Sequence, residues 1–121
     1  MQRMANDSGP INFRRGLLPL VILSLLESED MYGYQLVQEA ERRSGGAIVT
    51  QEGSLYPVLY KLLETGLITD RRMLAGKRMT RVYYHLEDAG KAHLEALARE
   101  YRTMVDGMLR LLDRGDGHER N

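Results

Sequence analysis

The chain has 121 residues, a length that fits one domain with a single hydrophobic core. It contains no cysteine, which excludes a disulfide framework, a thiolate metal site and a cysteine nucleophile, and which is compatible with a cytoplasmic location. Its 17 Lys and Arg residues balance 17 Asp and Glu residues, so no overall positive charge indicates nucleic acid as a partner.

The chain begins with polar residues 1–12, where "SGP" predicts a flexible N-terminal arm. No apolar stretch with a cleavage site follows, so this segment is not a signal peptide. A first helix is expected from about Phe13 to Glu27; it is apolar almost all round and therefore buried. Its apolar run is too short to cross a bilayer, and we expect no membrane contact. Pro19 requires that the regular helix either starts near Gly16 or bends there.

A second helix is expected from about Met31 to Arg43, with Asp30 as a candidate N-cap. "SGG" at 44–46 predicts a left-handed C-cap. "AIVT" at 47–50 is short and β-branched, so we expect an extended segment that could pair with a later hairpin. The spacing predicts that one face of the helix is packed, formed by Tyr34, Leu36, Val37 and Ala40.

A third helix is expected in "EGSLYPVLYKLLETGLI", starting near Gly53 or Ser54. Pro57 sets this start, because proline is harmless only in the first turn of a helix. Gly66 ends the helix. Its buried stripe is formed by Leu55, Val58, Leu59, Leu62 and Leu63.

A β-hairpin with a basic tip is expected next, with "LITDRRML" and "MTRVYYHL" as strands and "AGKR" as the turn. Between residues 70 and 81 a single acidic residue, Asp70, stands against five basic ones: Arg71, Arg72, Lys77, Arg78 and Arg81. The neutral net charge therefore conceals a basic patch.

The last predicted helix runs from about Glu87 to Leu112 and carries an unbroken heptad seam. One small domain cannot bury such a seam alone, so it predicts a partner chain and assigns residues 87–113 to dimerisation. Residues 114–121 are expected to be a disordered tail. The seam consists of Leu94, Leu97, Tyr101, Met104, Met108 and Leu111, and Ala98, Val105 and Leu112 widen it.

Three helices followed by a two-stranded wing form a winged helix-turn-helix, whose third helix enters the major groove of DNA. The predicted fold class is therefore mainly α with a small β-hairpin: a winged helix-turn-helix over 13–86 and a long C-terminal dimerisation helix. Lys and Arg on the wing would contact the phosphates that flank the groove.

Several short motifs occur together in the chain: Gly33-Tyr34, Gly53-Ser54-Leu55-Tyr56-Pro57, Glu64-Thr65-Gly66-Leu67-Ile68, Tyr83-Tyr84 and Gly90. With these motifs the chain resembles the PadR family of transcriptional regulators, in particular its smaller members with one C-terminal helix. The resemblance covers roughly residues 13 to 112. It implies a homodimeric repressor that binds a palindromic operator in double-stranded DNA. In some members of the family, the resemblance also implies a planar aromatic drug bound between the subunits.

The chain departs from the family pattern at two positions. Glu87 replaces the threonine that follows the Tyr-Tyr strand. The drug-binding members have a tryptophan on the last helix, whereas this chain has no tryptophan and the matching position is Tyr101.

The candidate DNA contacts lie on the third helix and the wing. Ser54 is an N-cap or a phosphate donor, and the two roles are compatible, since helix N-termini favour phosphate oxygens. Tyr56 is either a DNA contact or a packing residue, and Lys77 and Arg78 are phosphate contacts at the tip of the wing. Gln51 can read adenine. The full set is Gly33, Gln51, Ser54, Tyr56, Tyr60, Lys61, Lys77, Arg78 and Arg81.

A second candidate site is the seam of the last helix, which is either dimer core alone or also an adaptable ligand pocket, since methionine repacks around varied shapes. Phe13 would close such a pocket. The set is Phe13, Leu94, Leu97, Tyr101, Met104, Val105, Met108 and Leu111.

Catalytic residues, a metal site and a cofactor are not expected. His85, His93 and His118 are dispersed, and neither a zinc-binding motif nor a nucleophile elbow is present. We expect a DNA-binding repressor released by an effector at the dimer interface; the alternative is a winged-helix protein-interaction module or a regulator without a ligand pocket.

Overall fold

The structure, a computed structural model, describes residues 16–120, with side-chain environments up to residue 113. A first helix covers residues 16–28. It is followed by β1 (Met31–Tyr32), α2 (Gly33–Arg43), α3 (Glu52–Glu64), β2 (Ile68–Leu74), β3 (Thr80–Leu86) and α4 (Asp88–Arg120). The three strands form one antiparallel sheet in the order β1-β3-β2. The predicted mainly helical fold with a wing is confirmed.

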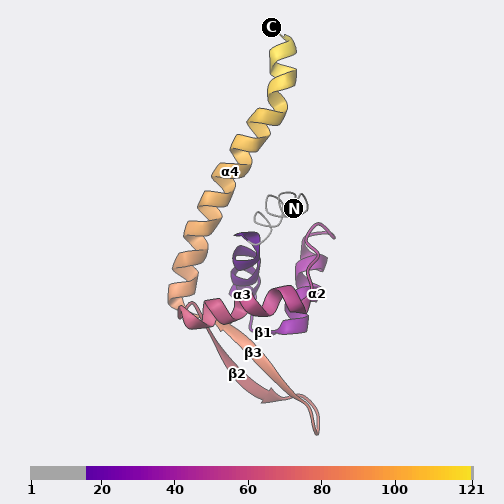
Figure 1. Ribbon diagram of the computed structural model, residues 1–121, viewed down its shortest axis with the longest axis vertical. Helices are drawn as coiled ribbons and strands as arrows, with labels where there is room; N and C mark the ends of the chain where they lie inside the picture. The colour runs from indigo at the N-terminus through magenta and orange to yellow at the C-terminus, as the bar shows by residue number, and fades with distance from the viewer. Residues whose placement is uncertain (1–15, 121) are drawn as a thin grey trace, which may run out of the picture.

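Two elements project from the helical part of the molecule. The β2–β3 hairpin and α4 extend in opposite directions from it, and α3 lies across the base of the hairpin (Figure 1). At about 1.5 Å per residue the 33 residues of α4 span roughly 50 Å. The hairpin tip, with Lys77 and Arg78 exposed, is therefore accessible to partners.

The core lies where the first helix, α2, α3 and one face of the sheet meet. The apolar run of the first helix is buried there as predicted, with Ile22 and Leu23 fully inaccessible. Burial also raises the pKa of Tyr84 on β3 to about 12, so its hydroxyl stays neutral in this environment. The other fully buried side chains are Met31, Leu36, Leu55, Leu59 and Ile68.

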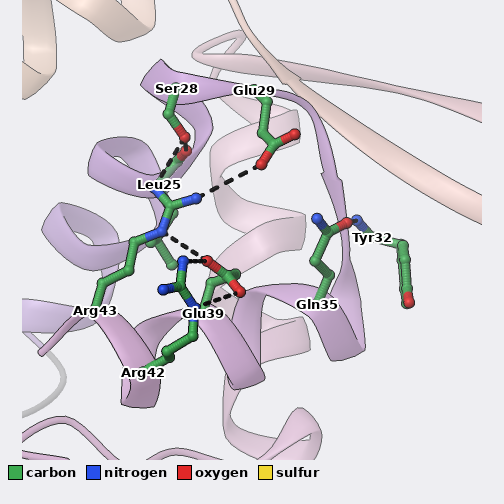
Figure 2. A network of polar contacts seen from close by, with 8 residues as sticks. All are labelled: Leu25, Ser28, Glu29, Tyr32, Gln35, Glu39, Arg42 and Arg43. Atoms are coloured by element: carbon green, nitrogen blue, oxygen red, sulfur yellow. Dashed lines mark hydrogen bonds and ion pairs between the residues drawn. The ribbon is translucent and has the colours of Figure 1, made fainter. Parts of the chain in front are cut away.

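Arg43 of α2 forms polar contacts with the C-terminal end of the first helix (Figure 2). Its guanidinium donates to Ser28 Oγ at 3.0 Å and to Glu39 Oε1 at 2.7 Å, and lies 3.6 Å from Glu29 Oε2. Arg42 also donates to Glu39, at 2.6 Å. The resulting network fixes the C-terminal ends of the two helices against each other.

The segment before α2 differs from the prediction. Asp30 is not the N-cap, because residues 31 and 32 pair with β3 and the helix begins at Gly33 with Tyr32 as its N-cap. The short strand was missed since two residues carry no periodicity. Asp30 instead accepts hydrogen bonds from Arg71 and from His85 Nδ1, the latter at 2.7 Å.

Residues 47–50 do not pair with the hairpin, so that prediction was wrong. They form a loop. The position beside β3 is taken by β1, whose residues Met31 and Tyr32 lie opposite Tyr84 and Tyr83. The third strand of the sheet therefore comes from a segment that was predicted to be the start of a helix.

The start of α3 also differs. The helix begins at Glu52, one residue earlier than expected, and Pro57 therefore lies in its second turn. The proline leaves the Gly53 carbonyl without its helical donor, but Gly53 is exposed, so water can bond it. The bonds from Ser54 N–H and Leu55 N–H to the Gln51 carbonyl, at 3.0 and 3.1 Å, close the first turn.

The packed face of α2 is narrower than expected. Leu36 and Ala40 are buried and Val37 packs against the core, but Tyr34 is 52% exposed and does not belong to that face. The predicted left-handed C-cap is confirmed by Gly45 and Gly46, with φ of 65° and 87°.

Candidate nucleic-acid interface

The face of α3 away from the core is polar and exposed. Leu55 and Leu59 on the inner face are 1% and 0% exposed, whereas Tyr60 on the outer face is 62% exposed. Gln51 is the N-cap of α3, so Ser54 inside the helix does not cap it. Because Ser54 is not the N-cap, contact with phosphate is the role that stays predicted for its hydroxyl. Ser54, Tyr60 and Lys61 on the helix and Gln51 at its N-cap are all exposed.

Tyr56 is half-buried and has a packing role. Its hydroxyl donates to Glu52 Oε2 at 3.2 Å, and its ring lies 6.2 Å from the Tyr60 ring. Burial, followed by the charge and hydrogen bond of Glu52, raises the pKa of Tyr56. Of the two roles predicted for this residue, packing is the one that its contacts support directly.

Gly33 lies buried under Tyr56 at the start of α2. A Cβ at this position would lie 2.5 Å from the Tyr56 hydroxyl oxygen and 3.0 Å from its Cζ atom. The glycine is therefore explained by close packing of α2 against α3. Nothing in the contacts of Gly33 supports the predicted approach to phosphate.

The tip of the hairpin carries the two expected cations. Lys77 and Arg78 are exposed in a turn closed by the Ala75 N–H bond to the Met79 carbonyl, at 2.8 Å. Gly76 adopts a φ of 99°, which only glycine adopts without strain. Within the described part of the chain, no ion pair neutralises Lys77 or Arg78.

Two arginines on the hairpin strands, Arg81 and Arg71, contact other side chains of the domain. The Arg81 guanidinium carbon lies 4.2 Å from the centre of the Tyr32 ring. Arg71 pairs with Asp30 and lies 5.9 Å from the centre of the Tyr83 ring. This cluster was not predicted; its signal in the sequence is a row of aromatic and basic residues at alternate positions of the wing strands.

The seam on α4 changes from buried to exposed along the helix. Leu94 is 6% exposed and Leu97 packs against the core, while Tyr101 and Val105 are half-buried. The later seam residues Met104, Met108 and Leu111 are 40%, 49% and 62% exposed. Phe13, the expected closing residue of a ligand pocket, lies outside the described residues.

The described residues contain neither a helix suited to spanning a membrane nor a metal-binding cluster of His, Cys, Asp and Glu. His85 bonds Asp30, and Glu87 accepts a hydrogen bond from Thr69 Oγ1 at 2.8 Å. The Glu87 N–H donates to the Leu67 carbonyl at 3.0 Å, so this departure from the family threonine still joins the hairpin to α4.

Comparison with known proteins places these features in a family. Residues 22–96 match the model of the transcriptional regulator PadR-like family. The chain is also similar to the transcriptional regulator YqjI of Escherichia coli strain K12, with 39% identity over 66 residues, which is 54% of this chain and 32% of that protein.

Two solved structures are similar over most of the chain. A PadR family transcriptional regulator from Eggerthella lenta has 32% identity and a TM-score of 0.71, covering 91% of this chain and 97% of that one. Bacillus subtilis PadR in complex with operator DNA has 30% identity and a TM-score of 0.62, covering 66% of this chain and 46% of that one. The chain thus spans less than half the length of the Escherichia coli and Bacillus subtilis proteins. With its winged helix, exposed α3 face and matching family model, the chain belongs to the PadR-like family of transcriptional regulators, which bind DNA and are not enzymes.

Proposed function

We propose that the protein is a homodimeric repressor that binds a palindromic operator and is released by a small molecule bound between the subunits. The observation that carries the DNA-binding part is the combination of an exposed polar face on α3 with two exposed cations at the wing tip, which form no ion pair with any described residue. The operator-bound structure of the Bacillus subtilis relative supports the same assignment.

In this proposal residues 13–86 are the DNA-binding part. Gln51, Ser54, Tyr60 and Lys61 face the major groove, where glutamine can read adenine and the other three reach base edges or phosphates. Lys61 lies 3.9 Å from Glu64, but both side chains are 74% exposed, so this pair is weak and DNA can displace it.

The wing tip supplies sequence-independent affinity. Each phosphate contact makes the fall of log K with log salt concentration steeper by about 0.9. One contact therefore raises the affinity at 0.1 M salt by roughly 8-fold relative to 1 M salt. Replacing Lys77 and Arg78 by Ala should therefore reduce the slope by about 1.8 and the affinity by up to about 60-fold. The measurement is fluorescence anisotropy at several salt concentrations, on a sequence selected from random DNA by the purified protein.

The matched control is Arg99→Ala with Arg110→Ala, which removes the same charge from α4. Both arginines are exposed and lie on the side opposite Met108, at about 100° per residue. We expect the control to leave the salt slope unchanged. A wing variant with the wild-type slope would refute the wing assignment and favour the alternative of a protein-interaction module.

The dimerisation part is residues 87–113. Beyond Leu97 the described residues cover the seam only in part, although Met104, Met108 and Leu111 follow heptad spacing. A second copy of α4 would bury this stripe by coiled-coil packing, which is the argument for a homodimer. Two DNA-binding parts would then face successive half-sites, roughly 34 Å apart.

Sedimentation equilibrium tests the dimer. Met108→Glu places a charge in the seam and should convert the protein to monomer at micromolar concentration. Arg110→Glu changes a residue on the opposite face and should leave the dimer intact. A wild-type monomer at micromolar concentration would contradict the dimer.

The effector part of the proposal rests on the seam and on the resemblance. Tyr101, Met104 and Met108 offer one aromatic ring and two adaptable thioethers to a planar aromatic molecule between the subunits. Tyr101→Ala should abolish saturable quenching or shift of the fluorescence of planar aromatic dyes. If no such compound binds the wild-type protein, the effector proposal is wrong while the DNA proposal remains.

A further inference from the structure

The outer face of the sheet carries a set of side chains distinct from its buried face. Met31, Tyr84 and Ile68 point into the core, being 0%, 4% and 1% exposed. Because side chains alternate along a strand, the neighbouring residues point outward. Strand pairing places Tyr32 on β1 opposite Tyr83 on β3, and Tyr83 opposite Arg71 on β2.

Four of the outward side chains form a continuous stack, defined here as the wing stack: Arg81, Tyr32, Tyr83 and Arg71. The Arg81 guanidinium lies 4.2 Å from the Tyr32 ring centre, and the Tyr32 and Tyr83 rings meet edge to face, at 5.4 Å and 75°. Arg71 lies 5.9 Å from the Tyr83 ring. Cation–π and edge-to-face contacts are both attractive, so the stack joins all three strands.

Two members of the wing stack, Arg71 and Tyr32, connect it to parts of the molecule outside the hairpin. Arg71 pairs with Asp30 in the segment that follows the first helix. Tyr32 immediately precedes α2, and its N–H lies 3.4 Å from Gln35 Oε1. The next residue, Gly33, packs under Tyr56 of α3. Contacts therefore run from the hairpin through Tyr32 to the helix proposed to enter the groove.

The hairpin needs such a connection because its backbone support is small. The strand β1 offers only two residues to β3, and a hairpin alone is marginally stable in water. The tip with Lys77 and Arg78 lies beyond the paired residues of β2 and β3. Small rotations at the base would therefore displace the tip from a phosphate.

We propose that Tyr32 and Arg81 are positioning residues that fix the direction of the wing relative to α3, and that Arg81 acts on DNA through Lys77 and Arg78 rather than by contacting phosphate itself. This inference rests on the proposed function, in which the wing tip binds the DNA backbone. It replaces the phosphate contact expected of Arg81 from the sequence.

A double-mutant cycle measures whether these residues act through the tip. Tyr32→Leu and Arg81→Gln are each made in the wild-type protein and in the variant with Lys77→Ala and Arg78→Ala. Tyr32→Phe, which keeps the ring, is the matched control. Affinity for the selected DNA is measured by anisotropy, and thermal unfolding at fixed protein concentration is recorded for each variant.

In the wild-type background Tyr32→Leu and Arg81→Gln should each weaken binding by about 10-fold, as loss of cation–π and aromatic contacts suggests. In the background without the tip charges neither should weaken binding further. Tyr32→Phe should bind as wild type. An equal loss from Arg81→Gln in both backgrounds, with the salt slope reduced by about 0.9, would show direct phosphate contact and overturn the inference.

The two hypotheses fail differently. If the tip variant binds DNA with wild-type affinity and slope, the proposed wing contact fails and the inference with it. If the tip variant behaves as expected but Tyr32→Leu and Arg81→Gln weaken binding equally in both backgrounds, only the positioning role fails. Arg81 is a half-exposed strand residue, so Arg81→Gln keeps the test valid should Tyr32→Leu fail to fold.

Discussion

Gly33→Ala tests the contact between α2 and α3 most directly. The added Cβ would lie 2.5 Å from the Tyr56 hydroxyl oxygen, 3.0 Å from Cζ and 3.4 Å from Cε1. A Cβ atom does not approach a non-bonded heavy atom to less than 3.0 Å, so the Tyr56 ring must move to admit the alanine. Because the ring is half-buried and its hydroxyl bonds Glu52, this movement also costs packing and that hydrogen bond.

The expected magnitude combines two opposing effects. Overpacking costs about 1–3 kcal/mol, whereas alanine in place of glycine stabilises a helix by roughly 0.5–1 kcal/mol. Gly33→Ala should therefore lower the free energy of unfolding by about 1–2 kcal/mol. At roughly 4 °C per kcal/mol for a domain of this size, Tm should fall by about 4–8 °C.

The assay is thermal and urea unfolding at one fixed protein concentration, since any dimer would make Tm depend on concentration. Gly53→Ala is the matched control, because no heavy atom lies within 4 Å of its added Cβ, and it should be neutral or stabilising. In a Tyr56→Leu background, which lacks all three contacting atoms, Gly33→Ala should cost nothing. Equal destabilisation by Gly33→Ala in both backgrounds would refute the packing argument.

Three further predictions concern the base of α4, the wing and the α2 network. Gly90→Ala should destabilise by more than Gly33→Ala, because its Cβ would meet the Leu67 carbonyl oxygen at 2.2 Å and backbone cannot rotate away; urea unfolding gives the difference, and a neutral variant would contradict the close approach. Asp30→Asn should shorten the lifetime of protected amides in β1, because an uncharged acceptor holds its arginine partner more weakly; unchanged exchange rates would show that the pair does not hold the strand. The hydrogen bond from Arg42 lowers the pKa of Glu39 from 4.5 to about 2, so its stabilising contribution is present above pH 4.5 and lost as pH falls towards 2; an NMR titration with a midpoint near 4.5 would contradict this.

The long elements were predictable from the sequence because their signals are local and repeated. The leucine stripe of α3, the hairpin with its basic turn and the heptad seam of α4 all follow from residue spacing. The helix ends at Gly45 and Gly66 were also predictable, since both residues adopt the positive φ that glycine favours. These local features were enough to predict the winged-helix fold and the α3 face.

The tertiary structure alone decided the contacts between elements. Two residues of β1 are too few for any periodic signal, and their pairing with β3 displaced both the N-cap expected at Asp30 and the strand expected at 47–50. Tyr34 and Tyr56 have the same side chain, yet one is exposed and the other packs over Gly33.

The surroundings of Arg81 on β3 also depend on contacts between elements. The phosphate contact expected of Arg81 stays a prediction. The structure adds that strand pairing brings the Tyr32 ring centre to 4.2 Å from the Arg81 guanidinium carbon, a contact that residue spacing did not predict. Spacing along a chain determines which residues share a face of one element. Which ring or carboxylate then meets that face depends on strand order and helix packing, and these are set by the fold as a whole.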